Sequence, residues 1–392
     1  MKTLKRTWAD ISLDNLEYNY RSIRAHLPQG TKFLGVMKAD AYGHGAVPVS
    51  RALADLGAEY LAVSNLEEAV QIRRGEVRLP ILILGYTPAE YASNMIFLDI
   101  TQEVHSLEYA RELNEALAGT NYILNVHLKL DTGMTRIGFF AYDNERTLDE
   151  LRQVAQLPHL HIEGVFMHFC VADSRAEADV SFTKLQYKRF MDMLSAMAGV
   201  GIRPEIRHCC NSGATILYPE FALDMVRPGI ITYGNAPSDE LAGALRLRPM
   251  MSLHSMIAQV RTVPAGTDIS YGRLYRTKEE TRVAVLPIGY ADGLSRLLTG
   301  KASFYLQGHQ VPVIGRICMD MCMIDVSGVP EAKPGDVVTI FGYDDDGTLL
   351  PCERLARAQG TINYELLCQI SKRIPRICHR GAETSQILQY IV

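Results

Sequence analysis

The sequence predicts an α/β protein with two domains, an N-terminal (β/α)8 barrel of the TIM type and a C-terminal, mostly β domain. Along the first two-thirds of the chain, short apolar runs alternate with amphipathic stretches, the pattern of a parallel sheet with crossover helices. Eight such runs can be counted, enough to close a barrel. After about residue 240 the helical pattern gives way to extended segments, and 392 residues exceed the usual size of one hydrophobic core.

The expected elements follow the chain in order. Residues 7–11 look extended, and an amphipathic helix with Ser12 as its N-cap follows, with Leu13, Leu16, Tyr20 and Ile23 at helical spacing. The eight predicted barrel strands are 32–37, 60–64, 81–85, 96–104, 123–130, 162–169, 205–210 and 225–228.

Beyond the barrel, Gly and Pro separate extended segments that predict a β domain. The clearest are 251–263, 282–288, 311–318 and 336–342. We therefore expect the barrel to span residues 12–240, and the β domain to span 241–392 together with residues 1–11.

Composition excludes several classes of function. With 40 Lys and Arg against 44 Asp and Glu, no basic cluster indicates a nucleic-acid partner. The apolar runs are too short to cross a bilayer, and the N-terminus lacks the apolar core of a signal peptide, so we expect a cytoplasmic protein without a membrane partner. The eight cysteines form no CxxC pair and are expected to be free, buried thiols. No metal site is expected.

One lysine stands where chemistry is expected. Lys38 follows the first barrel strand, within the sequence VMKADAYGHG of Val36 to Gly45. The carboxyl ends of barrel strands carry the active site of this fold. A lysine that is desolvated there has a lowered pKa, which makes it an amine nucleophile toward a carbonyl group.

This decapeptide resembles the pyridoxal phosphate attachment sequence of bacterial alanine racemases, with Lys38 as the lysine that binds the cofactor. Three further segments are similar to that family: KLDTGMTR from Lys129 to Arg136, SYG from Ser270 to Gly272, and GRICMD from Gly315 to Asp320. The resemblance covers nearly the whole chain. It implies a racemase that interconverts L- and D-alanine and supplies D-alanine for peptidoglycan.

The resemblance assigns the phosphate of the cofactor to the loops after the last two barrel strands, the preferred phosphate site of such barrels. The residues implied are Asn211, Ser212, Gly229, Ile230, Tyr42 and Tyr364.

Arg227 matches the residue at the pyridine nitrogen. A guanidinium does not release its proton near neutral pH, so that nitrogen should stay unprotonated. The ring is then a weaker electron sink, which favours return of the proton to the α-carbon over transamination.

The family uses two bases on opposite faces of the substrate. Here they match Lys38 and Tyr271, the latter supplied by the other subunit of a head-to-tail homodimer. The ordinary pKa of tyrosine, near 10, is high for a base at neutral pH, so nearby positive charge must favour the phenolate. His168 is placed by the resemblance between Tyr271 and Arg227.

Supporting positions also match. Arg136 and Met319 correspond to residues that bind the substrate carboxylate, while Tyr290 and Asp320 lie in further active-site segments. Lys129 matches a lysine that is carbamylated in many family members, and we hypothesise the same here because its charge would otherwise repel that of Arg136. The corridor that leads substrates to the site matches Asp173, Arg296, Arg316 and Ile362.

Three alternatives stay open. A serine or broad-specificity racemase shares the site, although the bulky Tyr364 would crowd a hydroxymethyl group. A pyridoxal phosphate decarboxylase of similar architecture places a carboxylate at the ring nitrogen, against which Arg227 argues. A non-enzymatic carrier of the cofactor is a solitary barrel, which the β domain with Tyr271 and Met319 opposes.

Overall fold

The computed structural model describes residues 6–142 and 144–390, which form two compact units. One, here called the barrel unit, comprises Leu16–Ala41 and Ala46–Arg248. The other, the β unit, comprises the described residues of Met1–Asn15, Tyr42–Gly45 and Pro249–Val392. Each is described by itself.

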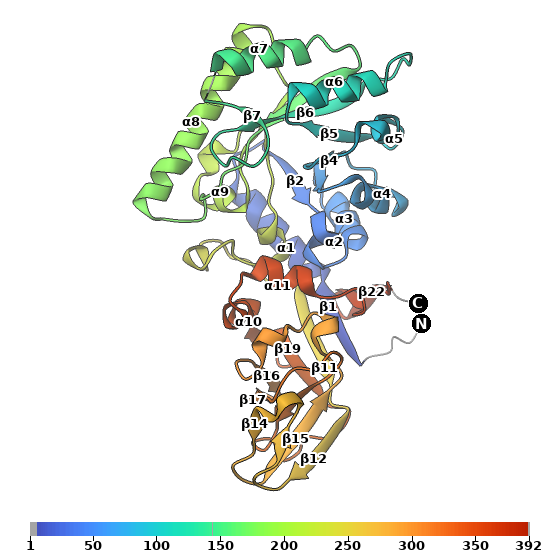
Figure 1. Cartoon of the computed structure of the whole chain (residues 1–392), viewed down its shortest axis with the longest axis vertical. Helices are drawn as coiled ribbons and strands as arrows, with labels where there is room; N and C mark the ends of the chain where they lie inside the picture. The colour runs from blue at the N-terminus through green and yellow to red at the C-terminus, as the bar shows by residue number, and fades with distance from the viewer. Residues whose placement is uncertain (1–5, 143, 391–392) are drawn as a thin grey trace. The chain divides into compact units, whose positions relative to one another are not determined.

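The barrel unit contains a closed ring of eight parallel strands, which confirms the predicted fold class. Each strand pairs with its neighbour in the order β2-β3-β4-β5-β6-β8-β9-β10, and β10 pairs with β2 to close the ring. Figure 1 shows helices outside these strands, as the crossover pattern predicts. The strands are β2 (Lys32–Val36), β3 (Tyr60–Val63), β4 (Ile81–Ile83), β5 (Ile100–Val104), β6 (Leu124–Asp131), β8 (Leu160–Phe166), β9 (Ile206–His208) and β10 (Met225–Val226), with the short β7 (Phe139–Phe140) beside β6.

Helices connect these strands. They are α1 (Leu13–His26), α2 (Lys38–Tyr42), α3 (Ala46–Asp55), α4 (Leu66–Arg74), α5 (Ala92–Phe97), α6 (Leu107–Ala116), α7 (Asn144–Val154), α8 (Glu177–Gly199) and α9 (Ser212–Leu217), with 3-10 turns η1 (Ala89–Tyr91), η2 (Pro219–Phe221), η3 (Ile230–Tyr233) and η4 (Asp239–Leu241). Ser12 caps α1, because its hydroxyl accepts a hydrogen bond from the amide of Asn15 at 3.1 Å, as predicted.

The fourth predicted strand, 96–104, was wrong in its first half. Residues up to Phe97 belong to helix α5, and the strand β5 begins only at Ile100. Between them Asp99 adopts a left-handed conformation with φ of 52°, which ends the helix and turns the chain. One apolar run spans both elements, so hydrophobicity alone did not separate them.

The β unit is built on one large, mostly antiparallel sheet. The strand order is β12-β15-β18-β17-β16-β19-β11-β1-β21-β22. The N-terminal strand lies inside this sheet, antiparallel to β11 and parallel to β21. The strands are β1 (Thr7–Ser12), β11 (Met251–Met256), β12 (Gln259–Val263), β13 (Asp268–Ile269), β14 (Tyr275–Arg276), β15 (Thr281–Leu286), β16 (Ser303–Leu306), β17 (His309–Ile314), β18 (Cys322–Asp325), β19 (Val337–Tyr343), β20 (Leu349–Leu350), β21 (Arg376–Arg380) and β22 (Glu383–Leu388).

Two helices of the β unit, α10 (Cys352–Gln359) and α11 (Asn363–Gln369), correct the expectation that helical structure ends near residue 240. Both are short, with eight and seven residues, whereas helical periodicity is read over a window of about 11–18 residues. Three 3-10 turns, η5 (Tyr271–Arg273), η6 (Tyr290–Asp292) and η7 (Arg296–Leu298), connect strands in the same unit.

All eight cysteines lie among the described residues and none forms a disulfide, as predicted. Their predicted burial holds for most of them, but Cys170 and Cys368 are exposed. Within the described part of the chain, no helix combines the length and the apolar character needed to span a membrane.

Candidate active site

Lys38 lies directly after β2, at the carboxyl end of the barrel strands. It begins α2, in which Ala39, Asp40, Ala41 and Tyr42 all have φ between 52° and 55°. This is a left-handed turn made entirely of residues other than glycine. Such a conformation costs about 1–2 kcal/mol per residue, so the surrounding structure must hold it in place.

Hydrogen bonds from the barrel unit hold this left-handed turn. The amide of Ala39 donates to Oε1 of Glu68 at 2.7 Å, and Oδ1 of Asp40 accepts from the amide of Ala46 at 2.8 Å. The amide of Ala41 donates to the carbonyl of Met37 at 2.8 Å. On the other side of Lys38, the amide of Met37 donates to the carbonyl of Ala62 at 2.7 Å. Because backbone groups on both sides of Lys38 are held, the position of its Cα is held as well.

Arg227 follows β10 and is buried in the barrel, with 3% of its surface exposed. Its Nη2 donates to the carbonyls of Met167 at 2.8 Å and Cys209 at 3.1 Å, and lies 3.3 Å from Nδ1 of His168. Its Nη1 lies 3.0 Å from Nδ1 of His208. Among the described residues none of its hydrogen bonds involves Nε, so the Nε–H is left over for a ligand such as a ring nitrogen.

Positive charge gathers in this part of the barrel. The ammonium of Lys129 lies 4.9 Å from the centre of the Phe166 ring, and the guanidinium of Arg227 lies 5.4 Å from the same centre. Burial, reinforced by Arg227 and Arg136, lowers the pKa of Lys129 to about 7. Burial and then Arg227 likewise hold the pKa of His168 well below its ordinary value, so His168 is neutral near pH 7. A site of this charge favours an anionic ligand.

Backbone amides and a hydroxyl meet in the loops after β9 and β10. Asn211 caps α9 by accepting a hydrogen bond from the amide of Ala214 at 3.0 Å. The hydroxyl of Ser212, the first residue of that helix, accepts from the amide of Gly229 at 2.9 Å. Gly229 precedes η3, so the starts of two helical segments lie beside one hydroxyl. Such starts bind phosphate through their amides.

Arg136 occupies an exposed loop after β6. This loop is shaped by Asp131, whose Oδ1 accepts hydrogen bonds from the amides of Gly133 at 2.9 Å and Thr135 at 3.1 Å. Thr135 has φ of 55°, a left-handed conformation that directs the chain just before Arg136.

In the β unit, Tyr271 follows a strained residue. Ser270 has φ of 64° and ψ of −175°, a region that glycine alone visits readily and that costs other residues about 1–3 kcal/mol. Its hydroxyl donates to the carbonyl of Arg316 at 2.6 Å, which holds this conformation. The side chain of Tyr271 is 69% exposed. The turn therefore presents a tyrosine outward from a fixed backbone.

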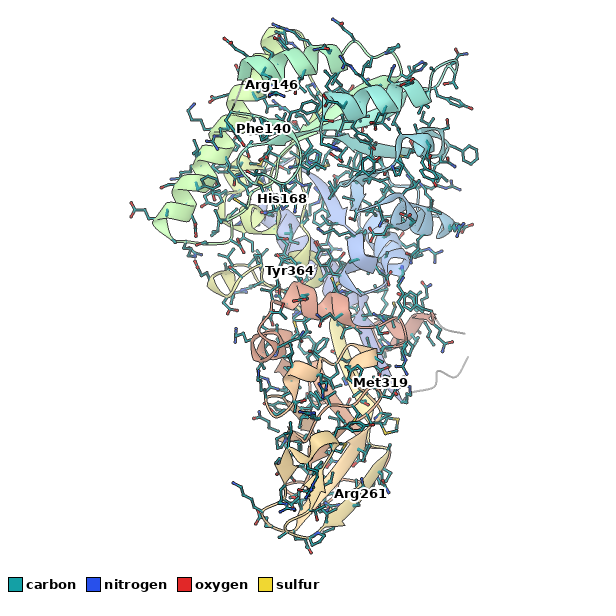
Figure 2. All side chains as sticks on the ribbon, viewed as in Figure 1. Phe140, Arg146, His168, Arg261, Met319 and Tyr364 are labelled. Carbon is teal, nitrogen blue, oxygen red and sulfur yellow. The ribbon has the colours of Figure 1, made fainter. Side chains whose placement is uncertain are left out.

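The segment of Met319 is attached to the turn η6. The amides of Tyr290 and Ala291 donate to the carbonyls of Cys318 and Met319, both at 3.0 Å. A Cβ on Gly289 would lie within 2.4 Å of both carbonyl oxygens, so this approach requires glycine. Figure 2 labels Met319 in the β unit and His168 in the barrel unit.

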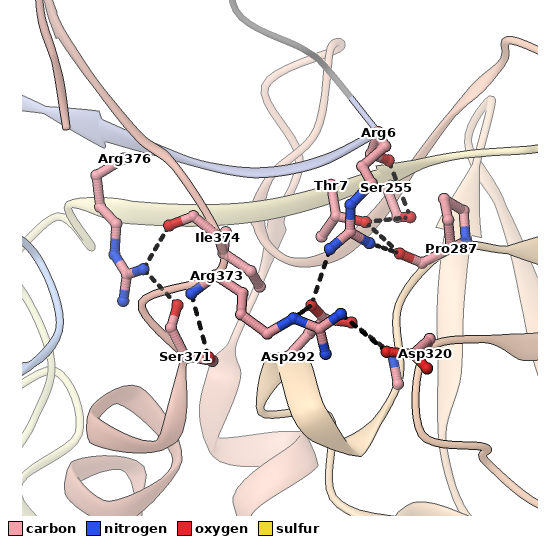
Figure 3. Close-up of polar contacts among 11 residues, drawn as sticks. Arg6, Thr7, Ser255, Pro287, Asp292, Asp320, Ser371, Arg373, Ile374 and Arg376 are labelled. Atoms are coloured by element: carbon pink, nitrogen blue, oxygen red, sulfur yellow. Dashed lines mark hydrogen bonds and ion pairs between the residues drawn. The ribbon is translucent and has the colours of Figure 1, made fainter. Parts of the chain in front are cut away.

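Figure 3 shows how charged groups hold this turn. Asp292 is fully buried and accepts hydrogen bonds from Arg6 at 3.1 Å and from the amide of Gly289 at 3.1 Å. Arg373 lies 3.7 Å from Asp292 and donates to Asp320 at 2.8 Å. These contacts connect the residue before strand β1, the turn η6 and the residue after Met319.

Asp292→Ala should lower the free energy of unfolding by about 2 kcal/mol, because a buried amide loses its partner while the two arginines, both partly exposed, regain water. Urea unfolding at constant protein concentration measures this loss. The matched control is Asp320→Ala, since Asp320 is half-exposed and its loss should change stability by less than about 0.5 kcal/mol. Equal losses in the two variants would contradict the role assigned to burial.

The predicted site residues thus fall into two groups. Lys38, Lys129, Arg136, His168, Asn211, Ser212, Arg227, Gly229 and Ile230 belong to the barrel unit, and Tyr42, Tyr271, Tyr290, Met319, Asp320 and Tyr364 to the β unit. In the β unit the rings of Tyr42 and Tyr364 lie 6.0 Å apart.

Sequence reasoning missed His127, His208 and Glu163, whose side chains reach Arg227 through hydrogen bonds. A signal existed, because His127 stands two positions before Lys129 on the same strand and thus on the same face.

Comparison with known proteins places the chain. The family model "Alanine racemase, N-terminal domain" matches residues 11–237, and "Alanine racemase, C-terminal domain" matches residues 250–378. Alanine racemase of Desulfovibrio desulfuricans is 46% identical over 370 residues, 94% of this chain and 97% of that protein. Alanine racemase of Clostridium tetani is 42% identical over the full length of both chains.

Solved structures agree. Alanine racemase of Clostridium difficile matches with a TM-score of 0.92 and 38% identity over the whole of both chains. A Bacillus anthracis alanine racemase structure with bound L-Ala-P matches with a TM-score of 0.92 and 34% identity, covering 100% of this chain and 99% of that one. The chain therefore belongs to the alanine racemase family and is an isomerase.

Proposed function

We propose that this protein interconverts L-alanine and D-alanine in the cytoplasm with pyridoxal 5′-phosphate as cofactor, and that the D-alanine supplies peptidoglycan synthesis. The observation that carries the proposal is the buried positive charge around Arg227, next to the starts of α9 and η3, whose amides suit a phosphate. Lysine at the end of β2 adds the amine that the cofactor requires. Membership of the alanine racemase family supports the reaction, while the cofactor and the substrate are inferred.

The groups of the barrel unit fit this cofactor. Ser212, Gly229 and Ile230, with Asn211 holding the helix start, would bind its phosphate. Tyr42 and Tyr364 are assigned to the same phosphate by resemblance. The spare Nε–H of Arg227 suits an acceptor nitrogen on the pyridine ring.

When bound, pyridoxal phosphate supplies an aldehyde that links covalently to amines and a ring that withdraws electrons from the α-carbon. Lys38 and Tyr271 then hold or accept the α-proton, one on each face. His168 is neutral because burial lowers its pKa, so it is able both to accept from and to donate to its neighbours. Arg136 and the amide of Met319 bind and orient the substrate carboxylate.

Arg227→Glu should raise the ratio of transamination to racemisation by about tenfold or more, because a carboxylate at the ring nitrogen favours its protonation and strengthens the electron sink. Pyruvate formed per racemisation event measures this ratio. Arg227→Lys is the control, since it keeps the cation and should change the ratio less. An unchanged ratio in Arg227→Glu would contradict the electronic argument.

Lys129 is proposed to carry a carbamate that binds Arg136. Its pKa of about 7 leaves much of the amine neutral near neutral pH. The neutral amine adds carbon dioxide and releases a proton, giving an anion in place of a cation. Carbamylation should therefore decrease as the pH falls below 7.

Carbon-13 NMR with labelled bicarbonate measures the modification, and Lys129→Ala, which lacks the amine, is the blank. A spectrum of the unsubstituted protein that matches the blank would remove the carbamate from the proposal.

A head-to-tail homodimer is proposed to complete the site, with Tyr271 and Met319 of one subunit serving the barrel of the other. Three large side chains of the β unit support this, since Tyr271, Met319 and Tyr290 are 69%, 53% and 43% exposed. Large apolar side chains that are exposed together on one surface commonly mark a site where another protein binds. Sedimentation of the holoenzyme tests the dimer.

The function itself is tested by following the optical activity of L-alanine with purified, cofactor-supplemented protein, and L-serine in parallel. Decay to zero with alanine supports the proposal. Faster decay with serine would assign a serine racemase, and no decay with either substrate would contradict the racemase.

A further inference from the structure

A row of hydrogen-bonded side chains crosses the interior of the barrel and ends at Arg227. Nη1 of Arg227 lies 3.0 Å from Nδ1 of His208, and Nε2 of His208 lies 2.9 Å from Nδ1 of His127. Nε2 of His127 lies 3.2 Å from Oε2 of Glu163. We call these four residues the Glu163–Arg227 relay. Both histidines are fully buried.

The chemistry of its two ends fixes the direction of every bond. Arg227 only donates, so Nδ1 of His208 must accept and its Nε2 must carry the proton. That proton is donated to Nδ1 of His127, whose Nε2–H then donates to the carboxylate of Glu163. Burial holds the pKa of both histidines below the ordinary value, so each is neutral and has one proton. A single arrangement of protons satisfies all three bonds.

A β-bulge in the backbone directs the side chain of Glu163 toward His127. Val126 pairs with Ile162 and His127 pairs with Gly164, so Glu163 is the extra residue of a β-bulge between β6 and β8. A Cβ on Gly164 would lie 2.5 Å from the ring of His127, so only glycine leaves room for this imidazole. Bulges that redirect a side chain commonly lie near active sites.

Glu163 is stabilised as an anion. Partial burial raises its pKa, but hydrogen bonds from His127, Tyr60 and Thr101 outweigh that effect and hold the pKa below its ordinary value. The hydroxyl of Tyr60 donates at 2.8 Å and that of Thr101 at 3.2 Å.

Arg227, in contrast, contacts only uncharged partners, and among the described residues no carboxylate lies within ion-pair distance of it. A buried cation requires compensation.

We propose that Glu163 is a positioning residue that acts through His127 and His208 to compensate the charge of Arg227 and to fix the direction of its donors. Glu163 lies in the middle of β8, and Arg227 lies just beyond the end of β10. The electrostatic effect of the carboxylate on Arg227 is therefore carried by the two histidines inside the barrel. The consequence for catalysis rests on the proposed function: by keeping Arg227 a weak acid, Glu163 keeps the ring nitrogen unprotonated.

The first test needs no cofactor. Nitrogen-15 NMR of histidine side chains in the cofactor-free, full-length protein should show His127 and His208 as neutral Nε2–H tautomers from pH 6 to 8. Gly164→Ala, which forces the His127 ring to move, should disturb both signals together. Either histidine found as the Nδ1–H tautomer, or doubly protonated at pH 7, would overturn the relay.

The second test is a double-mutant cycle on stability with Glu163→Gln and Arg227→Gln, which remove charge but keep hydrogen-bonding groups. Residues that do not touch usually give additive effects. The relay predicts that the double variant loses less free energy of unfolding than the two single variants lose together. The difference should correspond to about a tenfold change in the unfolding equilibrium constant. Tyr60→Phe is the control, because it leaves both charges and should combine additively with Arg227→Gln. Additivity in both cycles would overturn the proposal.

In the holoenzyme, Glu163→Gln should raise the ratio of transamination to racemisation by about three- to tenfold, in the same direction as Arg227→Glu but less, because the lost charge is remote. Tyr60→Phe should leave this ratio unchanged. If the unsubstituted protein does not racemise alanine, the proposed function fails. The histidine tautomers seen by NMR and the energetic coupling of Glu163 with Arg227 still test the relay in that case. If racemisation is normal and the coupling is absent, only the relay fails.

Discussion

Lys38→Ala is expected to abolish the long-wavelength absorbance of lysine-bound pyridoxal phosphate and to reduce racemisation on the order of 10⁴-fold or more. The substitution removes both the amine that would attach the cofactor and the base on one face of the substrate. Backbone bonds to Glu68 and Asp40 hold the left-handed turn and do not involve the substituted atoms, so the fold should survive.

The matched control is Lys32→Ala, at the exposed start of β2, the strand that precedes Lys38. It removes an equal charge and should keep both colour and activity. Circular dichroism of the two variants separates loss of chemistry from loss of structure. A yellow, active Lys38→Ala protein would disprove the assignment of Lys38.

Tyr271→Phe is expected to keep the colour but to lose about 10²–10⁴-fold in racemisation, the usual effect of removing one positioned acid or base. The loss should be one-sided, because Lys38 still serves the other face. Exchange of the α-proton in heavy water should persist for one enantiomer of alanine and fail for the other.

Tyr275→Phe, four residues further along the same hairpin, is the control and should leave both exchange rates unchanged. The side chain of Tyr271 is largely exposed, so its hydroxyl contributes little to stability, and unfolding of Tyr271→Phe should match that of the unsubstituted protein. Equal exchange from both enantiomers in Tyr271→Phe would refute its role as a base.

Much of the barrel was predictable because its information is local. Each buried parallel strand is a continuous apolar run, so the eight strands could be found one by one. The exception was 96–104, where a helix and a strand share one run. In the β unit, where strands have one polar face, the sequence indicated only some of the strands. It did not predict the two short helices α10 and α11.

The candidate site shows the same division. Roles for Lys38, Tyr271 and Arg227 could be predicted from short motifs, since a motif records residue types that chemistry requires at a fixed spacing. The buried partners of Arg227 could not, because His127, Glu163 and His208 come from strands separated by tens of residues. Their contact exists only once the barrel closes.

The sequence by itself determined the class of fold, the position of the lysine after its strand and the family to which the chain belongs. Tertiary structure alone decided the left-handed turn that holds Lys38, the strained residue before Tyr271 and the pairing of β1 between β11 and β21. The physical reason is that hydrophobic period and residue chemistry act locally. Left-handed backbone and buried hydrogen bonds are stable only when distant segments supply the partners that offset their cost.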